Sequence, residues 1–275
     1  MLAGTAAAAT PVAELSWTAF GLALAVALLL QTAVNYANDY FDAVKGVDTE
    51  DRTGPRRAVA SGLIAPGAMK RAIAVTMLLA ALAGLALAAL VGWELLLVGV
   101  AALLATLGYS GGSKPYASAA LGEVMVFVFF GVVATVGSAY VQDGTVTLLA
   151  AVVSVPIGAL ATALLVVNNL RDIPTDAPAG KRTLAVRLGE ARTRQLFAGL
   201  CGTALASVIV VALLTGSPAV LVAWVAAPLL LRAGRPARSA PLGPALIVVL
   251  ERTARAQLLF AVALTAALLT IGAGS

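Results

Sequence analysis

The sequence predicts an all-α fold, a polytopic transmembrane helical bundle, on the strength of three observations. The chain has 275 residues, and 61% of them are hydrophobic. Only 11% are charged, whereas a soluble domain of this size carries roughly a quarter. The mean hydropathy is +0.98. We therefore predict an integral membrane protein in which residues 1–275 form a single domain embedded in a lipid bilayer.

The apolar runs divide into eight predicted membrane spans. A membrane helix needs about 17–25 apolar residues, and the connections between spans are recognised by their charged and turn-forming residues. The expected spans are 15–37, 69–91, 93–110, 120–141, 145–169, 191–214, 217–232 and 255–273.

The basic residues indicate how the bundle is oriented. All 18 Lys and Arg residues lie in or beside the connections 43–68, 111–119, 170–190 and 233–254. The opposite connections hold Glu14, Glu94 and Asp143 and no cation. Cytoplasmic loops carry the excess of Lys and Arg, so we expect a multi-pass protein of the plasma membrane with these four connections in the cytoplasm. Since topology accounts for the net charge of +5, no nucleic-acid partner is expected.

Two residue types restrict the chemistry. The chain has no histidine, which excludes His-based zinc sites, Ser-His triads and haem ligation by histidine. Its one cysteine, Cys201, lies in an apolar run and is expected to be a packing residue. Neither a P-loop nor a dinucleotide-binding Gly-x-Gly-x-x-Gly motif is present. Carboxylates are therefore the main candidates for a functional site.

The first polar cluster lies at the end of the first span. Asn35, Asn38, Asp39 and Asp42 are spaced i, i+3, i+4 and i+7, so on a helix they share one face. Ionisable groups are costly at a membrane, which makes this face a candidate site. We predict that Asp39 and Asp42 bind Mg²⁺ and that the asparagines contact substrate. The alternative is an ordinary polar helix end in interfacial water.

The second cluster resembles the first. Asn168, Asp172 and Asp176 are spaced i, i+4 and i+8, and Asn169 lies beside them. We expect Pro174 to break or kink the helix, which would place Asp176 on a loop. A simple loop cap is the alternative. Two carboxylate pairs suit divalent cations, and with neighbouring Arg and Lys they suit a diphosphate. Diphosphate chemistry in a membrane protein points to a prenyl substrate.

Basic side chains and the turn-forming segment 109–116 are further candidates for binding that diphosphate. Arg52, Arg56 and Arg57 could bind phosphate oxygens in bidentate fashion. The glycines of the segment 109–116 can expose backbone N–H groups to an anion. Each cation could equally be a topology signal, and turn chemistry alone could explain the segment. Glu123 follows it and could face the same cavity or mark the membrane interface. The substrate-binding candidates are Arg56, Tyr109, Lys114, Lys181 and Arg182.

A transporter that uses its carboxylates to carry protons or cations is an alternative of a different class. Transporters bind their cargo near the middle of the membrane, at broken helices. Here the acidic residues gather at one face of the membrane and accompany Arg and Lys, as phosphate binding requires.

Several motifs together resemble one family. They are Asn38-Asp39-Tyr-Phe-Asp42, Arg-Thr-Gly-Pro-Arg-Arg-Ala-Val-Ala-Ser-Gly-Leu-Ile and Asn-Asn-Leu-Arg-Asp-Ile-Pro-Thr-Asp. From about residue 30 onward the chain is similar to the UbiA superfamily of intramembrane prenyltransferases. Within that superfamily it looks like the subgroup, of actinobacterial type, that prenylates 1,4-dihydroxy-2-naphthoate in menaquinone biosynthesis.

The resemblance implies a fold, a metal and two substrates. The fold would have about nine helices around a central cavity capped on the cytoplasmic side, so we expect this chain to lack the first. Mg²⁺ would be held by Asp39, Asp42, Asp172 and Asp176. The family pattern places a further acid at position 46, where this chain has Gly46, and Asp48 could substitute. The implied substrates are polyprenyl diphosphate and 1,4-dihydroxy-2-naphthoate, which would give demethylmenaquinone. Alternative acceptors are 4-hydroxybenzoate, homogentisate or a tetrapyrrole.

Overall fold

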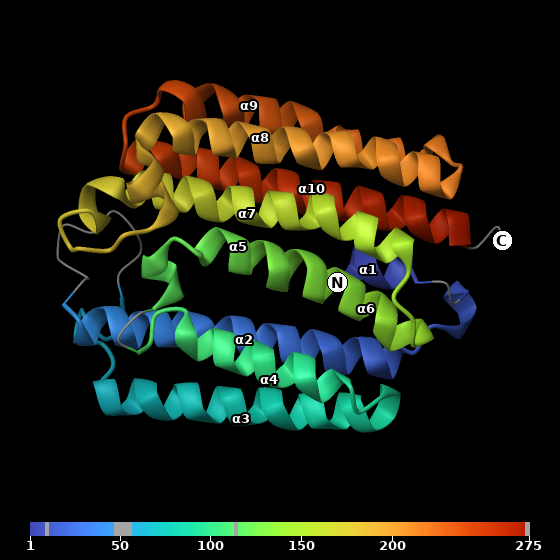
Figure 1. Cartoon of the computed structure of the whole chain (residues 1–275), viewed down its shortest axis with the longest axis horizontal. Helices are drawn as coiled ribbons and strands as arrows, with labels where there is room; N and C mark the ends of the chain where they lie inside the picture. Colours follow the sequence, from blue (N-terminus) through green and yellow to red (C-terminus); the bar gives the residue numbers. More distant parts are fainter. Residues whose placement is uncertain (9–10, 47–56, 113–114, 273–275) are drawn as a thin grey trace.

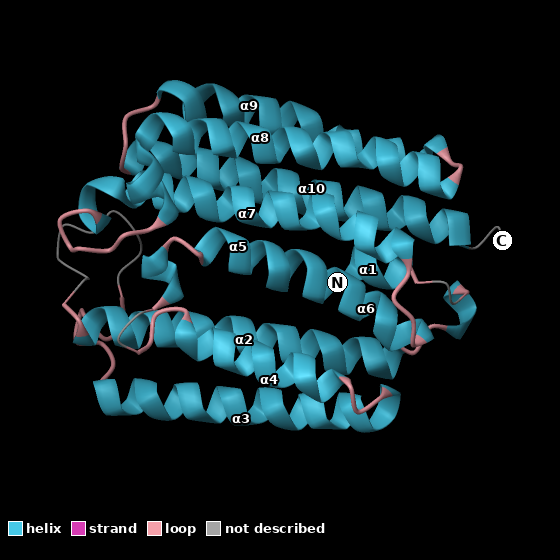
Figure 2. Cartoon of the chain, in the orientation of Figure 1, coloured by secondary structure: helices cyan, strands magenta, loops and turns pink. Residues whose placement is uncertain are grey.

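The computed structural model describes residues 1–8, 11–46, 57–112 and 115–272, and all regular structure in them is helical (Figure 2). Within these described residues, seven helical rods are long and apolar enough to cross a membrane, and α4 is a shorter apolar helix. These seven rods and α4 correspond to the eight predicted spans, which confirms the all-helical membrane fold. The helices are α1 (Leu2–Ala6), α2 (Trp17–Val44), α3 (Pro66–Val91), α4 (Leu95–Gly108), α5 (Gly122–Val126), α6 (Ala134–Asp143), α7 (Leu148–Asp176), α8 (Leu184–Thr215), α9 (Ala227–Ser239) and α10 (Ile247–Gly272). Five shorter segments complete them: η1 (Val12–Glu14), η2 (Tyr116–Ala119), η3 (Phe127–Val133), η4 (Pro218–Ala226) and η5 (Pro244–Leu246).

The helices are arranged in two groups with one rod between them (Figure 1). Helices α2, α3 and α4 form one group, and α7, α8, α9 and α10 form the other. The rod of α5, η3 and α6 runs between α2 and α7. The main core belongs to the second group and includes Leu160, Leu170, Phe197 and Phe260. Within the apolar part of α7, 67% of the residues are buried, so α7 is the central scaffold of the bundle.

Two glycines set how closely the middle rod approaches α7. A Cβ atom added to Gly131 in η3 would lie 2.5 Å from the Cα of Gly158 in α7. The ring of Phe127 also lies against Gly158. The segment η3 is a π-helix, a form that occurs often near functional sites. This contact fixes the position of α5, the next segment toward the charged end of the bundle, against α7.

We predict that Gly131→Ala lowers the stability of the protein by about 1–3 kcal/mol, because an added methyl group must displace backbone atoms. Thermal unfolding in detergent measures the effect. Gly137→Ala is the matched control, since a Cβ atom at Gly137 meets nothing within 4 Å. Equal melting temperatures for the two variants would show that the Gly131–Gly158 approach is not needed.

The helix ends segregate as the charge pattern predicts. The C-terminal ends of α2, α7 and α9 and the N-terminal ends of α3, α8 and α10 lie at one end of the bundle (Figure 1). The turns that carry Glu94 and Asp143 lie at the other end. All the cations of the described residues therefore belong to one end, and this arrangement is that of a multi-pass membrane protein.

The expected break at Pro174 is wrong. Helix α7 continues through Pro174 and ends at Asp176, so Asp176 is its last residue and not part of a loop. Proline removes the N–H that would bond to the carbonyl four residues earlier. Membrane helices tolerate this when neighbouring hydroxyl groups bond to the backbone. Thr175 Oγ1, next to Pro174, donates to the carbonyl of Asp172 at 3.0 Å, whereas the carbonyl four residues before Pro174 is that of Leu170.

Candidate active site

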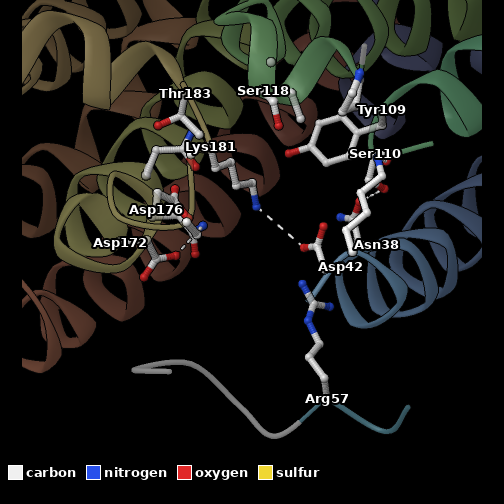
Figure 3. Close-up of a pocket in the computed structure, with 18 residues that line it drawn as sticks. Asn38, Asp42, Arg57, Tyr109, Ser110, Ser118, Asp172, Asp176, Lys181 and Thr183 are labelled. Atoms are coloured by element: carbon white, nitrogen blue, oxygen red, sulfur yellow. Dashed lines mark hydrogen bonds and ion pairs between the residues drawn. The ribbon is translucent and has the colours of Figure 1, made fainter. Parts of the chain in front are cut away.

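A pocket of about 350 Å³ opens at the charged end of the bundle, between the end of α2 and the end of α7 (Figure 3). It therefore lies where the two helix groups face each other. Its charged and amide-bearing lining residues are Asn38, Asp42, Lys45, Arg57, Asn168, Asn169, Asp172, Asp176 and Lys181. Tyr109, Ser110, Ser118, Gly122 and Thr183 also line it.

The α2 wall is built from residues spaced by one helical turn. Asn38, Asp42 and Lys45 occupy positions i, i+4 and i+7 and all line the pocket. Ser110 Oγ donates to Asn38 Oδ1 at 2.5 Å. Lys45 Nζ donates to the carbonyls of Ser110 at 2.7 Å and Gly112 at 3.1 Å. These bonds connect the end of α2 to the segment that follows α4.

The α7 wall carries Asn168, Asp172 and Asp176 on one face. Both oxygens of the Asp172 carboxylate accept from Arg171: Nε donates to Oδ1 at 2.6 Å and Nη2 to Oδ2 at 2.7 Å. Arg171 Nη2 also donates to Asn168 Oδ1 at 3.0 Å. Arg171 is 6% exposed. The pair neutralises the Asp172 charge and fixes its orientation at the pocket.

An ion pair connects the two walls. Lys181, in the connection after α7, places Nζ 3.6 Å from Oδ2 of Asp42 (Figure 3). The guanidinium of Arg57 points toward Asp42 from the opposite side in the same view. Three carboxylates and three cations thus line the described pocket, and the cations come from three separate segments. This mixture suits a ligand whose anionic groups replace protein carboxylates around the cations.

Asp39 and Asn35 do not line the pocket, in contrast to the single polar face expected for α2. Asp39 accepts from the backbone N–H groups of Ala58 and Val59, both at 2.9 Å. This carboxylate therefore holds the turn that begins beside Arg57. Asn35 is exposed and donates to the carbonyl of Gln31 at 2.9 Å. Of the four residues, Asn38 and Asp42 therefore line the pocket, whereas Asp39 and Asn35 make contacts outside it.

Tyr109 points its hydroxyl group into the pocket, toward Ser118 (Figure 3). Burial raises the pKa of the Tyr109 phenol far above its usual value, and the nearby Tyr116 and the carboxylates of Glu123, Asp42 and Asp176 raise it further. The phenol is therefore neutral at every working pH. It can donate a hydrogen bond to a ligand in the pocket.

The remaining predicted residues fall in three places. Asn169 lines the pocket and donates through Nδ2 to Oε1 of Glu123 at 2.9 Å. Arg182 is exposed and is not among the residues that line the pocket. Arg56, Lys114 and Asp48 lie outside the described residues.

The lining residues fit a magnesium ion that binds together with an anionic ligand. Carboxylate and amide oxygens are the donors that Mg²⁺ prefers, and it usually binds through one or two carboxylates, water and substrate phosphates. Asp42, Asp172, Asp176, Asn38 and Asn168 supply such oxygens. Within the described residues, no three acidic side chains lie close enough to hold an ion by themselves. These residues would hold a magnesium ion together with an anionic ligand, and the ion would supply positive charge to that ligand.

Comparison with known proteins identifies the family. A model of the UbiA prenyltransferase family matches residues 1–241. The chain belongs to the UbiA prenyltransferase family. It is 49% identical to 1,4-dihydroxy-2-naphthoate octaprenyltransferase of Mycobacterium tuberculosis, over 98% of this chain and 90% of that protein. The protein of the same name from Mycobacterium leprae is 44% identical, over 99% of this chain and 91% of its own length.

Solved structures show the same fold. This UbiA-family chain superposes on a UbiA homologue from Archaeoglobus fulgidus, bound to GPP and Mg²⁺, with a TM-score of 0.65. The match covers 97% of this chain and 94% of the archaeal chain, at 16% sequence identity. At that identity the likeness concerns the arrangement of helices only.

Sequence reasoning missed the roles of Lys45 and Arg171 in this UbiA protein. Lys45 could have been found, because it continues the one-turn spacing of Asn38 and Asp42 along α2. Arg57, which the sequence indicated with Arg52 and Arg56 as a possible phosphate contact, lines the pocket. The sequence could not distinguish Arg171 from the arginines that only set the membrane topology, because its role depends on the side-chain geometry around Asp172.

Proposed function

We propose that this protein transfers a polyprenyl group from polyprenyl diphosphate to 1,4-dihydroxy-2-naphthoate, with loss of CO₂, in the biosynthesis of menaquinone. The observation that carries the proposal is the 49% identity to a naphthoate octaprenyltransferase over nearly the whole chain. The mixed acidic and basic pocket supports it, since both substrates are anions. The same reasoning favours prenyl transfer over the transport of ions.

Three cations are placed to receive the donor's diphosphate. Lys45, Arg57 and Lys181 line the pocket from three segments. Positive groups held in advance at a departing diphosphate stabilise the charge that develops there as the bond breaks. The neutral Tyr109 phenol adds a hydrogen-bond donor. Lys114, in the connection after α4, is a further candidate for this role.

The acidic residues would hold the magnesium ion. Asp42, Asp172 and Asp176 would bind it, and it would neutralise part of the charge on the diphosphate. Arg171 keeps the Asp172 carboxylate oriented toward the pocket. Asp39 acts on the same site through the turn at Ala58 and Val59, which places Arg57 beside Asp42.

The reaction breaks two bonds and forms one. The allylic C–O bond of the donor breaks, and its electron pair leaves with the diphosphate. The naphthoate ring carbon that bears the carboxylate forms the new C–C bond with the prenyl carbon. The bond to the carboxylate then breaks, CO₂ leaves and its electron pair restores the aromatic ring. The immediate product is the dihydroxy form of demethylmenaquinone.

The site faces the cytoplasm of a plasma membrane in this proposal. The cations of the described residues belong to the pocket end of the bundle, which the positive-inside rule assigns to the cytoplasm. The aromatic acceptor and the diphosphate group would then reach the pocket from water, while the polyprenyl tail stays in lipid.

A transfer assay in membranes tests the proposal. Radiolabelled polyprenyl diphosphate is incubated with 1,4-dihydroxy-2-naphthoate, 4-hydroxybenzoate or homogentisate, with Mg²⁺ or with EDTA. We expect labelled product only from the naphthoate with Mg²⁺, together with equimolar CO₂. Labelling of a different acceptor would assign another pathway, and labelling that survives EDTA would contradict the magnesium site. Membranes without the expressed protein are the control.

A further inference from the structure

Glu123, near the start of α5, is a buried carboxylate with one unused oxygen. Its side chain belongs to a residue only 5% exposed. Oε1 accepts from Asn169, whereas Oε2 has no hydrogen-bond partner in the described part of the protein. No ion pair to Glu123 is found among the described residues either. An ionised buried oxygen without a donor is costly, so a ligand that donates to it would be favoured.

Glu123 is not itself a lining residue of the pocket, but it lies directly behind the pocket wall. Gly122, its neighbour in the chain, and Asn169, its hydrogen-bond partner, both line the pocket. A Cβ atom at Gly122 would lie 3.5 Å from the side chain of Leu165, so α5 lies within van der Waals contact of α7 here. The carboxylate also lies close enough to contribute to the raised pKa of the Tyr109 phenol.

We propose that Glu123 binds the aromatic acceptor, by accepting a hydrogen bond at Oε2 from a ring hydroxyl group. This inference rests on the proposed function and names a subsite within it. Asn169 positions the carboxylate through Oε1. The contact would select acceptors that carry a hydroxyl donor at the correct ring position, and it would orient the reacting carbon toward the donor.

Charge decides which hydroxyl group faces Glu123. The 1-hydroxyl group of the naphthoate lies next to the ring carboxylate, so binding it to Glu123 would bring two carboxylates together. The 4-hydroxyl group is meta to that carboxylate and para to the 1-hydroxyl group, so it lies farther from the carboxylate. With the 4-hydroxyl group on Glu123, the ring carboxylate can face the cations that line the pocket. The proposed contact is therefore between Oε2 and the 4-hydroxyl group.

Binding of an acceptor analogue tests this contact. 1-Hydroxy-2-naphthoate lacks only the 4-hydroxyl group, and its inhibition constant is compared with the KM of the full acceptor. For the wild-type protein we expect the analogue to be weaker by about ten- to a hundredfold, the range of a hydrogen bond to a charged group. In Glu123→Gln this ratio should fall to within about threefold, because the charged acceptor is lost. The KM of polyprenyl diphosphate should not change.

Controls separate this inference from other failures. Glu251→Gln alters an exposed glutamate on α10 and should keep the wild-type ratio. If Glu123→Gln does not fold, 1-hydroxy-4-methoxy-2-naphthoate tests the wild type alone, since its oxygen cannot donate. Equal binding of these analogues and the full acceptor by the wild type, or an unchanged ratio in Glu123→Gln, overturns the inference. A wild type that transfers nothing to the naphthoate overturns the proposed function instead.

Discussion

Asp42→Asn is expected to reduce prenyl transfer by about a hundredfold or more, since single preorganised charge contacts at reacting groups contribute factors of this size. Asp42 belongs to the α2 wall of the pocket and also contacts the opposite wall, since it lies 3.6 Å from the Lys181 ammonium group. The amide keeps the size of the side chain and removes its charge. Steady-state rates with saturating naphthoate and varied polyprenyl diphosphate and Mg²⁺ measure the loss.

The control for Asp42→Asn is Asp143→Asn. Asp143 lies in the final turn of α6, at the opposite end of the bundle, and this variant should keep near-full activity. Both variants should melt within a few degrees of the wild type in detergent. An Asp42→Asn protein that is folded and retains most of its activity would exclude Asp42 from magnesium and diphosphate binding.

Arg171→Leu is expected to cost about 3 kcal/mol of stability, because it leaves the Asp172 carboxylate without its counter-charge. Removing one partner of a buried pair usually costs about 3–5 kcal/mol, and the lower end applies because Asp172 retains some contact with solvent. The side chains of Arg171 and Asp172 are 7% and 17% exposed. Thermal unfolding in detergent measures the change.

An exposed pair supplies the matched control for Arg171. The guanidinium of Arg255 lies 3.8 Å from the carboxylate of Glu251, and both side chains are more than half exposed. Arg255→Leu should therefore cost less than about 1 kcal/mol. The double variant Arg171→Leu/Asp172→Leu should regain much of the stability and remain inactive. Equal losses for Arg171→Leu and Arg255→Leu would contradict a buried structural pair.

The fold could be predicted because membrane helices follow from runs of apolar residues. All eight predicted spans correspond to helical rods, and the expected core position of Cys201 is confirmed. The boundaries were less accurate where polar residues continue a helix. Helix α2 extends to Val44, beyond the predicted end at 37, because its polar turns pack against the segment after α4. Helix α7 continues through Pro174 to Asp176, whereas the helix-breaking tendency of proline predicted a loop there.

The site could be predicted only as far as residue type and spacing determine it. Spacing placed Asn38 and Asp42 together, but it could not show that the Asp39 carboxylate turns away to the backbone of Ala58 and Val59. Those N–H groups carry no signature in the sequence. The position of Glu123 likewise depends on the close approach of η3 to α7. Contacts between distant segments therefore account for most of what sequence reasoning missed.

The lengths of α2 and α7 have a consequence for how a lipid substrate reaches the protein. Their 28 and 29 residues correspond to roughly 42–44 Å at about 1.5 Å per residue, whereas the hydrocarbon layer is about 30 Å thick. With their apolar parts placed in that layer, the last turns of both helices, which carry the acidic residues, would lie among the phospholipid headgroups. Lifting a lipid chain into water costs about 0.8 kcal/mol per CH₂ group. A polyprenyl donor can instead enter the site laterally from one leaflet and react at the depth of the headgroups. Its prenyl chain then stays in the lipid from substrate to product.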